Sequence, residues 1–243
     1  MKLRILKVGG SVITDKGSEA FEKLKPETID EVCRAIAENW QNLILVHGAG
    51  SFGHPHVKKF GLTTSGASRT HLACMKLNHY LCSRLQDAGV AVLPVHPFSF
   101  YLRNETLKCN LELIERALNS GFLPVLHGDV IFGRGIEVLS GDDIVIHLSE
   151  HTKPSRIGFA TDVDGVLYRG EVLGRLDRET FEDLIRSEGA EKGERVDVTG
   201  GMLKKVQKIF ELKSKCEVFV FRGNYSNIKK FLNGGKVGTE VIL

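Results

Sequence analysis

Short apolar runs rich in β-branched residues alternate with helical patterns along the whole chain. These runs are nearly continuous in apolar residues, as is typical of strands covered on both faces in a parallel sheet. They occupy residues 3–8, 42–47, 90–95, 122–130, 156–163 and 217–223. The segments between them carry apolar residues at helical spacing, and helices are expected from Pro26 to about residue 40 and at 69–88, 110–120, 142–151, 177–187 and 202–215. This alternation predicts a three-layer α/β/α sandwich with an open, mostly parallel central sheet.

The chain of 243 residues shows no internal repeat, low-complexity tract or linker, so a single domain spanning residues 1–243 is expected. In open α/β sheets, ligands gather at the carboxyl ends of the strands. The unusual residues of this sequence follow its predicted strands. The site is therefore expected along that edge of the sheet.

Composition excludes several classes of protein. The net charge of +3 is too small to indicate a nucleic-acid binder. The five cysteines are odd in number and form no CxxC pair, which argues against a disulfide framework or a thiolate metal site, and no metal-binding residues are predicted. The N-terminal apolar run is too short for a signal peptide, and no stretch approaches the roughly 20 apolar residues of a membrane span. A cytoplasmic protein without membrane contact is expected.

The first chemical cluster, Lys7 to Ser11 with Thr14 to Lys16, follows the first predicted strand. Its paired glycines, Gly9 and Gly10, leave room for backbone N–H groups to approach phosphate oxygens, with Lys7 supplying positive charge beside them. A tight turn with a solvated lysine would have the same pattern.

The second cluster, HGAGSFGH, spans His47 to His54 and matches the dinucleotide fingerprint formally. That fingerprint also needs an acid about 20 residues on, to hold the ribose. No Asp or Glu lies between His54 and Gln86, and the same interval holds five basic residues. A second phosphate-holding loop, with His54 as a hydrogen-bond donor, fits better than a nicotinamide site. A lone histidine is more often structural.

Two further clusters follow later strands. Ser140 to Asp143 opens a predicted helix, where either aspartate can cap the helix or hold two cationic side chains in position. Thr161 to Gly165 forms a turn suited to a nucleotide, and residues 198–205 combine a Gly-Gly helix start with lysines one turn on. Walker A and protein-kinase motifs are absent.

In this order, KVGGS, HGAGS, the GD at a helix start, TDVDGV and VTGGMLKK resemble the amino-acid kinase superfamily. The longer forms KVGGSVITDK and HGAGSFGH are similar to its isopentenyl phosphate kinase branch. The matching motifs run from Lys7 to Lys205. The resemblance implies the amino-acid kinase fold, an acceptor side at about 1–150 and a nucleotide side at about 151–243.

The resemblance also implies roles for single residues. Lys7, Lys16 and Lys205 would act on the transferring phosphoryl group, with Asp142 as the organising aspartate and Asp143 as a helix cap. The nucleotide would be held by Lys7, Gly9, Gly10, Ser11, Gly50, Asp162, Gly165, Gly201 and Lys205. The acceptor phosphate would be held by Ala49, Gly50, His54 and Gly141.

The implied activity is phosphorylation of isopentenyl phosphate by ATP with Mg²⁺, in isoprenoid (mevalonate-pathway) biosynthesis, by a homodimer. A phosphate acceptor is already anionic and needs no general base, which agrees with the lysine-rich inventory. The tail pocket is open at this stage: Leu72, Met75, Leu77, Tyr80 and Leu81 have a spacing more typical of a core. Alternatives are a fosfomycin-kinase-like enzyme acting on another small phosphate or phosphonate, and a non-catalytic nucleotide-binding sensor.

Overall fold

An eight-stranded sheet forms the centre of the computed structural model, which describes residues 2–15, 21–168, 170–190 and 200–243. The strand order is β12-β14-β13-β9-β1-β2-β6-β3. Every neighbouring pair is parallel except β13 and β14. The strands are β1 (Arg4–Val8), β2 (Leu43–His47), β3 (Val92–Val95), β6 (Leu123–His127), β9 (Arg156–Thr161), β12 (Arg175–Leu176), β13 (Glu217–Arg222) and β14 (Thr239–Val241). The predicted α/β fold with a mostly parallel sheet is confirmed.

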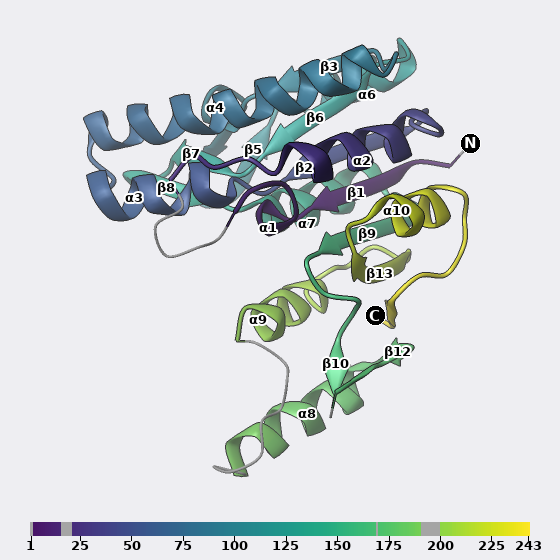
Figure 1. The fold of residues 1–243 in the computed structure, drawn as a ribbon. Coiled ribbons are helices and arrows are strands. Elements are labelled where there is room, and N and C mark those ends of the chain that lie inside the picture. The colour runs from purple at the N-terminus through teal and green to yellow at the C-terminus, as the bar shows by residue number, and fades with distance from the viewer. Residues whose placement is uncertain (1, 16–20, 169, 191–199) are drawn as a thin grey trace.

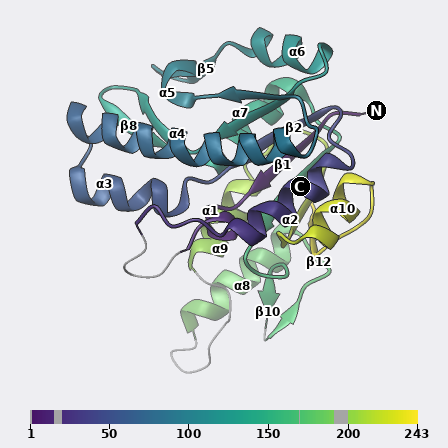
Figure 2. The ribbon, with the colours of Figure 1, turned by 45° about the horizontal axis from the view of Figure 1, so that its top comes forward.

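Helices cover both faces of this sheet (Figure 1). They are α1 (Gly10–Ile13), α2 (Pro26–Ala37), α3 (His54–Phe60), α4 (Thr64–Asp87), α5 (Pro97–Phe100), α6 (Leu111–Asn119), α7 (Gly141–Thr152), α8 (Arg178–Ala190), α9 (Gly200–Ile209) and α10 (Tyr225–Leu232), with a 3₁₀ turn at Gly50–Phe52. Figures 1 and 2 both show α3 and α4 side by side.

Alternate residues of each central strand enter different cores, as the pleat of a strand requires. In β1, Leu6 and Val8 belong to the core beneath α2, α4 and α10, whereas Ile5 belongs to the core on the opposite face. That opposite core contains apolar residues from α6, α7, α8 and α9. Apolar layers therefore pack against both faces of the sheet that carries the carboxyl edge.

Some predicted boundaries are wrong. The run 122–130 is two strands rather than one: β6 ends at His127, and after Gly128 the chain enters β7 (Asp129–Phe132). This β7 belongs to a second sheet of order β5-β4-β7-β8, with β4 (Tyr101–Arg103), β5 (Leu107–Cys109) and β8 (Ile136–Leu139), and a separate ribbon joins β10 (Leu167–Tyr168) to β11 (Glu171–Val172).

The second main helix, expected at 69–88, already begins at Thr64. The Thr63 hydroxyl accepts a hydrogen bond from Gly66 N at 3.1 Å, which makes Thr63 the N-cap. In the part of the chain that the structure describes, no helix has the length and apolar character needed to cross a membrane.

Candidate active site

A cavity of about 1100 Å³ lies along the carboxyl ends of β1, β2, β6 and β9. Its walls come from the four clusters singled out in the sequence. The predicted site residues that line it are Lys7, Gly9, Gly10, Ser11, Ala49, Gly50, His54, Gly141, Asp142, Asp162, Gly201 and Lys205. The tertiary structure thus brings together residues that lie almost 200 positions apart in the chain.

The carboxylate of Asp142 bridges two lysines at the centre of this cavity. Lys7 Nζ lies 2.9 Å from Asp142 Oδ1, and Lys205 Nζ lies 2.9 Å from Oδ2. Lys7 comes from β1, Asp142 from the first turn of α7 and Lys205 from α9. One partly buried anion therefore holds two cations from opposite ends of the chain close together.

Burial by itself would raise the pKa of Asp142, but the two neighbouring ammonium groups outweigh it and hold that pKa well below its usual range. Burial and the positive charge of Lys7 lower the pKa of Lys205 to about 8, against the opposing effect of Asp142. At neutral pH the trio therefore carries a net positive charge. Such a site attracts phosphate oxygens.

Gly10 and Gly50 make the closest backbone approach in the site. A Cβ atom on Gly10 would lie 2.4 Å from Gly50 N, and a Cβ on Gly50, whose φ is +52°, would lie 2.0 Å from Thr14 Oγ1. Thr14 Oγ1 donates to Gly10 O at 2.7 Å and accepts from Ser51 N at 3.0 Å, which joins the two loops. Only glycines permit this contact, and it leaves a cradle lined by backbone rather than by side chains.

The first turn of α7 is held by a capping box. Ser140 Oγ accepts from Asp143 N at 3.2 Å, and Asp143 Oδ2 accepts from Ser140 N at 3.2 Å. Lys208 of α9 places Nζ 2.6 Å from Asp143 Oδ1. Asp142 therefore contacts the lysines of the cavity, whereas the N-cap of the helix is Ser140 and Asp143, predicted as the cap, is the N3 residue that completes the capping box.

Sequence reasoning missed Lys208, although a signal was present. Lys205 and Lys208 are three residues apart, so they lie on the same face of α9. Asp142 and Asp143 on α7 each pair with one of these two lysines of α9. These two ion pairs attach α9 to the start of α7.

Two predicted residues are not placed in the cavity. Lys16 lies outside the described residues. Gly165 is buried, is not among the residues that line the cavity, and packs so closely that its Cβ would lie 2.6 Å from Thr239 Oγ1. Asp162 and Gly201, from the C-terminal part of the chain, both line the cavity.

The apolar end of the cavity differs from the stripe considered in the sequence. Leu77 and Leu81 of α4 are fully buried in the core, and Leu72 is 61% exposed. The wall is formed instead by Val57, Thr70, Cys74, Val130 and Val138. The stripe considered in the sequence lies on α4, as do Thr70 and Cys74 of this wall. The rotation of α4 about its axis decides which of its faces meets the cavity.

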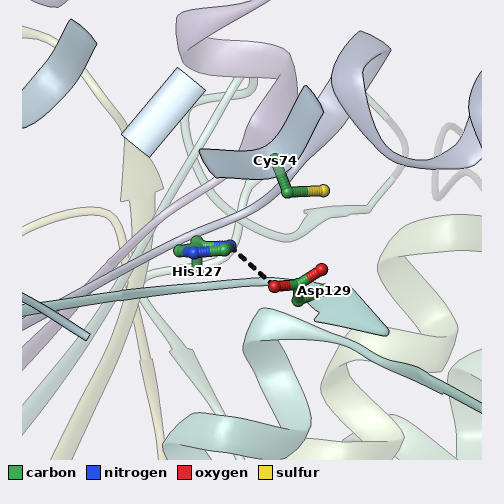
Figure 3. Close-up of side chains that lie close together, drawn as sticks. All are labelled: Cys74, His127 and Asp129. Carbon is green, nitrogen blue, oxygen red and sulfur yellow. Dashed lines mark ion pairs between the residues drawn. The ribbon is translucent and has the colours of Figure 1, made fainter. Parts of the chain in front are cut away.

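One group of potential metal ligands lies beside this wall: Cys74, His127 and Asp129, whose donor atoms are within 4.8 Å of one another (Figure 3). Asp129 Oδ2 accepts from His71 Nδ1 at 2.7 Å, and burial, opposed by His71, raises the pKa of Asp129. Cys74 and His127 also have partners. Hydrogen bonds among neighbouring side chains and backbone account for the whole group.

Comparison with known proteins agrees with this geometry. The model of the amino acid kinase family matches residues 2–222. The isopentenyl phosphate kinase of Methanocaldococcus jannaschii is 33% identical, with 98% of each chain covered, and that of Haloferax volcanii is 36% identical, with 99% of each covered. The structure of the T. acidophilum isopentenyl phosphate kinase product complex superimposes with a TM-score of 0.79 at 26% identity, covering 99% of this chain and 100% of that one. The protein belongs to the amino acid kinase family, in the branch that holds the isopentenyl phosphate kinases.

Proposed function

We propose that this protein transfers the γ-phosphoryl group of ATP to isopentenyl phosphate and releases isopentenyl diphosphate and ADP. The observation that carries the proposal is the Asp142 carboxylate bridging Lys7 and Lys205 between two glycine loops. The relatives that share this chain's full length support the identity of the acceptor.

On the nucleotide side, Gly9, Gly10, Ser11 and Gly50 hold the phosphates of ATP, and Asp162, Gly165 and Gly201 belong to the pocket for the rest of the nucleotide. Gly165 acts indirectly, because its close packing against Thr239 sets the turn after β9. On the acceptor side, Ala49, His54 and Gly141 hold the phosphate of the substrate. The acceptor side thus lies within the residues up to about 150, whose loops also hold the phosphates of ATP, and the rest of the nucleotide is held by residues from about 151. Both parts belong to one domain, whose central sheet contains strands from each.

The transfer is direct and in line, from the γ-phosphorus to a phosphate oxygen of the acceptor. That oxygen is already anionic, so no side chain needs to remove a proton. The work of the protein is to overcome the repulsion between two anions and to neutralise the charge that develops during transfer. Lys7, Lys205 and Lys16 supply the neutralising positive charge. Asp142 orients Lys7 and Lys205.

The residues present suit a nucleotide that brings its own metal ion. Both oxygens of Asp142 already contact ammonium groups at 2.9 Å, so a metal ion would compete with Lys7 and Lys205 for this carboxylate. Mg²⁺ is commonly bound through substrate phosphates rather than by an all-protein cage. When bound, Mg²⁺ neutralises charge on the phosphates of ATP.

A cytoplasmic location stays a prediction from the sequence. We also propose that the protein is a homodimer. Leu102 of β4 and Phe132 of β7 are paired across neighbouring strands and are 46% and 51% exposed. Contiguous exposed apolar surface marks interaction sites, and this pair is the contact that we assign to the dimer. Sedimentation of the wild type and of Phe132→Lys tests this: a dimer that the substitution dissociates agrees with it, and a wild-type monomer contradicts it.

The activity is tested by a coupled assay with ATP and Mg²⁺ on isopentenyl phosphate, dimethylallyl phosphate, UMP, glutamate, acetylglutamate and fosfomycin. Turnover on isopentenyl phosphate, alone or with its dimethylallyl isomer, agrees with the proposal. Turnover only on another acceptor, as a fosfomycin-kinase-like enzyme would give, removes the prenyl substrate. ATP binding without any turnover indicates a sensor.

A further inference from the structure

Two buried histidines end neighbouring strands beneath the acceptor side of the cavity. His47 closes β2 and His127 closes β6, and the two are register partners whose rings stack 5.6 Å apart. A glycine follows each one. His47 Nδ1 lies 3.2 Å from Gly48 O, and His127 Nδ1 lies 3.1 Å from Gly128 O. Both side chains are fully buried.

His47 is neutral at physiological pH, since burial lowers its pKa to about 4. A neutral imidazole has one N–H and one acceptor nitrogen. Two oxygens face the ring, however: Gly48 O beside Nδ1, and Asn78 Oδ1 at 3.1 Å from Nε2. The ring has only one proton for the two.

An exchange of the amide oxygen and nitrogen of Asn78 removes this conflict at the ring. Asn78 Nδ2 is buried and has no hydrogen-bond partner in the described part of the chain. A half-turn of the amide exchanges its oxygen and nitrogen. Nδ2 then donates to His47 Nε2, so the single proton of the ring resides on Nδ1 and is donated to Gly48 O. The Cys82 sulfur, which lies 3.6 Å from Asn78 Oδ1, then faces the amide nitrogen as a weak acceptor instead of donating to the oxygen. The arrangement at His127 is compatible with the same tautomer, because His96 Nδ1, 3.0 Å away, can donate to His127 Nε2.

The hydrogen bond to Gly48 O also sets the direction of the next backbone N–H, that of Ala49. In a trans peptide the C=O and the following N–H point in opposite directions. With Gly48 O turned toward the buried ring, Ala49 N–H turns toward the cavity. Ala49 N lies 3.5 Å, and Gly141 N 3.4 Å, from the place where a Cβ on Gly128 would be. Among the described residues, no acceptor for the Ala49 N–H is found.

We propose that His47 is a positioning residue for the acceptor: its Nδ1–H holds the peptide between Gly48 and Ala49 so that Ala49 N–H, with Gly141 N–H, faces the phosphate of the substrate. The inference rests on the proposed function for the identity of the acceptor. It adds a buried side chain that never contacts the substrate. The ring acts through one carbonyl oxygen, and the stacked His127 keeps the ring in place.

The test is a pair of substitutions that separate the two ring nitrogens. Asn carries its amide nitrogen near the position of Nδ1, and Gln carries it near the position of Nε2. His47→Asn therefore keeps a donor for Gly48 O, whereas His47→Gln keeps a contact with Asn78 and loses that donor. We expect His47→Gln to raise the KM for isopentenyl phosphate about tenfold, the effect of one lost hydrogen bond, with the KM for ATP nearly unchanged. His47→Asn stays closer to the wild type.

A purely structural role would lower the thermal midpoint of both variants without separating their KM values for the acceptor. Equal KM values for the two variants, or an equal rise in the KM for ATP, would overturn the proposal. If the wild type itself does not use isopentenyl phosphate, the proposed function fails, and that outcome is distinct from failure at His47.

A second measurement uses the unaltered protein and needs no turnover. Long-range proton–nitrogen correlation spectra of the histidine rings distinguish the two tautomers, and a proton on Nδ1 of His47 is expected. Adding inorganic phosphate or isopentenyl phosphate without ATP should shift the backbone amide resonance of Ala49. A proton on Nε2, or an Ala49 amide that responds to neither ligand, contradicts the inference.

Discussion

Replacing Asp142 by Asn removes one negative charge from the centre of the lysine pair and preserves the shape of the side chain. Lys205 loses the anion that favours its charged form, while burial and Lys7 continue to oppose that form. The pKa of Lys205, about 8 in the intact site, must therefore fall. The question is whether it falls far enough to discharge the lysine at neutral pH.

The geometry sets the magnitude. Opposite charges about 4 Å apart interact by about 4 kcal/mol at the effective dielectric constant of about 20 that suits partly buried pairs. At about 1.36 kcal/mol per pKa unit, this corresponds to a fall of roughly 3 units. With a fall of about 2 units, from about 8 to roughly 6, only about one Lys205 in eleven keeps its proton at about pH 7. The free variant enzyme then loses about tenfold in kcat/KM for ATP.

The assay is kcat/KM for ATP as a function of pH, which reports ionisations of the free enzyme. The ratio of Asp142→Asn to wild type at each pH cancels the ionisation of the substrates. Because the active form of Lys205 is the protonated one, the wild type should lose activity above about pH 8, and the variant at a pH about 1–3 units lower. The activity ratio should therefore recover as the pH is lowered. A ratio that stays constant with pH would refute the idea that Asp142 acts through the charge of Lys205.

Asp143→Asn is the matched control, because it makes the same chemical change one residue along. Asp143 is the N3 residue of the capping box at the start of α7 and pairs with Lys208. Loss of its charge should cost at most about 1 kcal/mol of unfolding free energy, the typical cost of losing a helix cap. The alkaline limb of the kcat/KM profile should stay in place. A limb that moves equally in both variants would show that the shift is not specific to Asp142.

Three further predictions concern the walls of the cavity. His54→Ala should lower kcat/KM for the phosphate acceptor by about 10- to 100-fold, the effect of one hydrogen bond to a charged group, and unchanged steady-state constants would exclude His54 from acceptor binding. Gly10→Ala should abolish turnover, because its Cβ would lie 2.4 Å from Gly50 N. Gly201→Ala is the control, because a Cβ there meets nothing within 4 Å. A Gly10→Ala variant as active as Gly201→Ala would disprove the close approach of the two loops. Cys74→Leu should reduce kcat/KM for isopentenyl phosphate about tenfold by filling the apolar end of the cavity while sparing a one-carbon alkyl phosphate, and equal losses on both acceptors would move the tail elsewhere.

The period of the apolar residues was enough to predict the layered α/β fold and most of its long elements. Strands covered on both faces and amphipathic helices differ in local pattern, and that pattern is written in the sequence. A glycine that ends a strand, and the change of sheet that follows it, leave a weaker signal in the sequence. The run 122–130 reads as one strand, yet Gly128 divides it, because β7 pairs with β8 rather than continuing beside β2.

The motifs also predicted which residues meet in the cavity, because loops that follow parallel strands share one edge of the sheet. Their order in the chain indicated the family, and the family indicated the chemistry. Lys7, Asp142 and Lys205 could be named from the sequence alone. Their mutual distances could not be, since three separate elements have to dock before one carboxylate meets two ammonium groups.

Tertiary packing alone decided the rest. The rotation of α4 puts Thr70 and Cys74, rather than Leu77 and Leu81, against the cavity. The docking of β2 beside β6 buries His47, and burial is what keeps its imidazole neutral and leaves one proton for Gly48 O. Sequence specifies local period and residue chemistry, whereas the face that a side chain presents and the charge that it carries depend on neighbours brought from elsewhere in the chain.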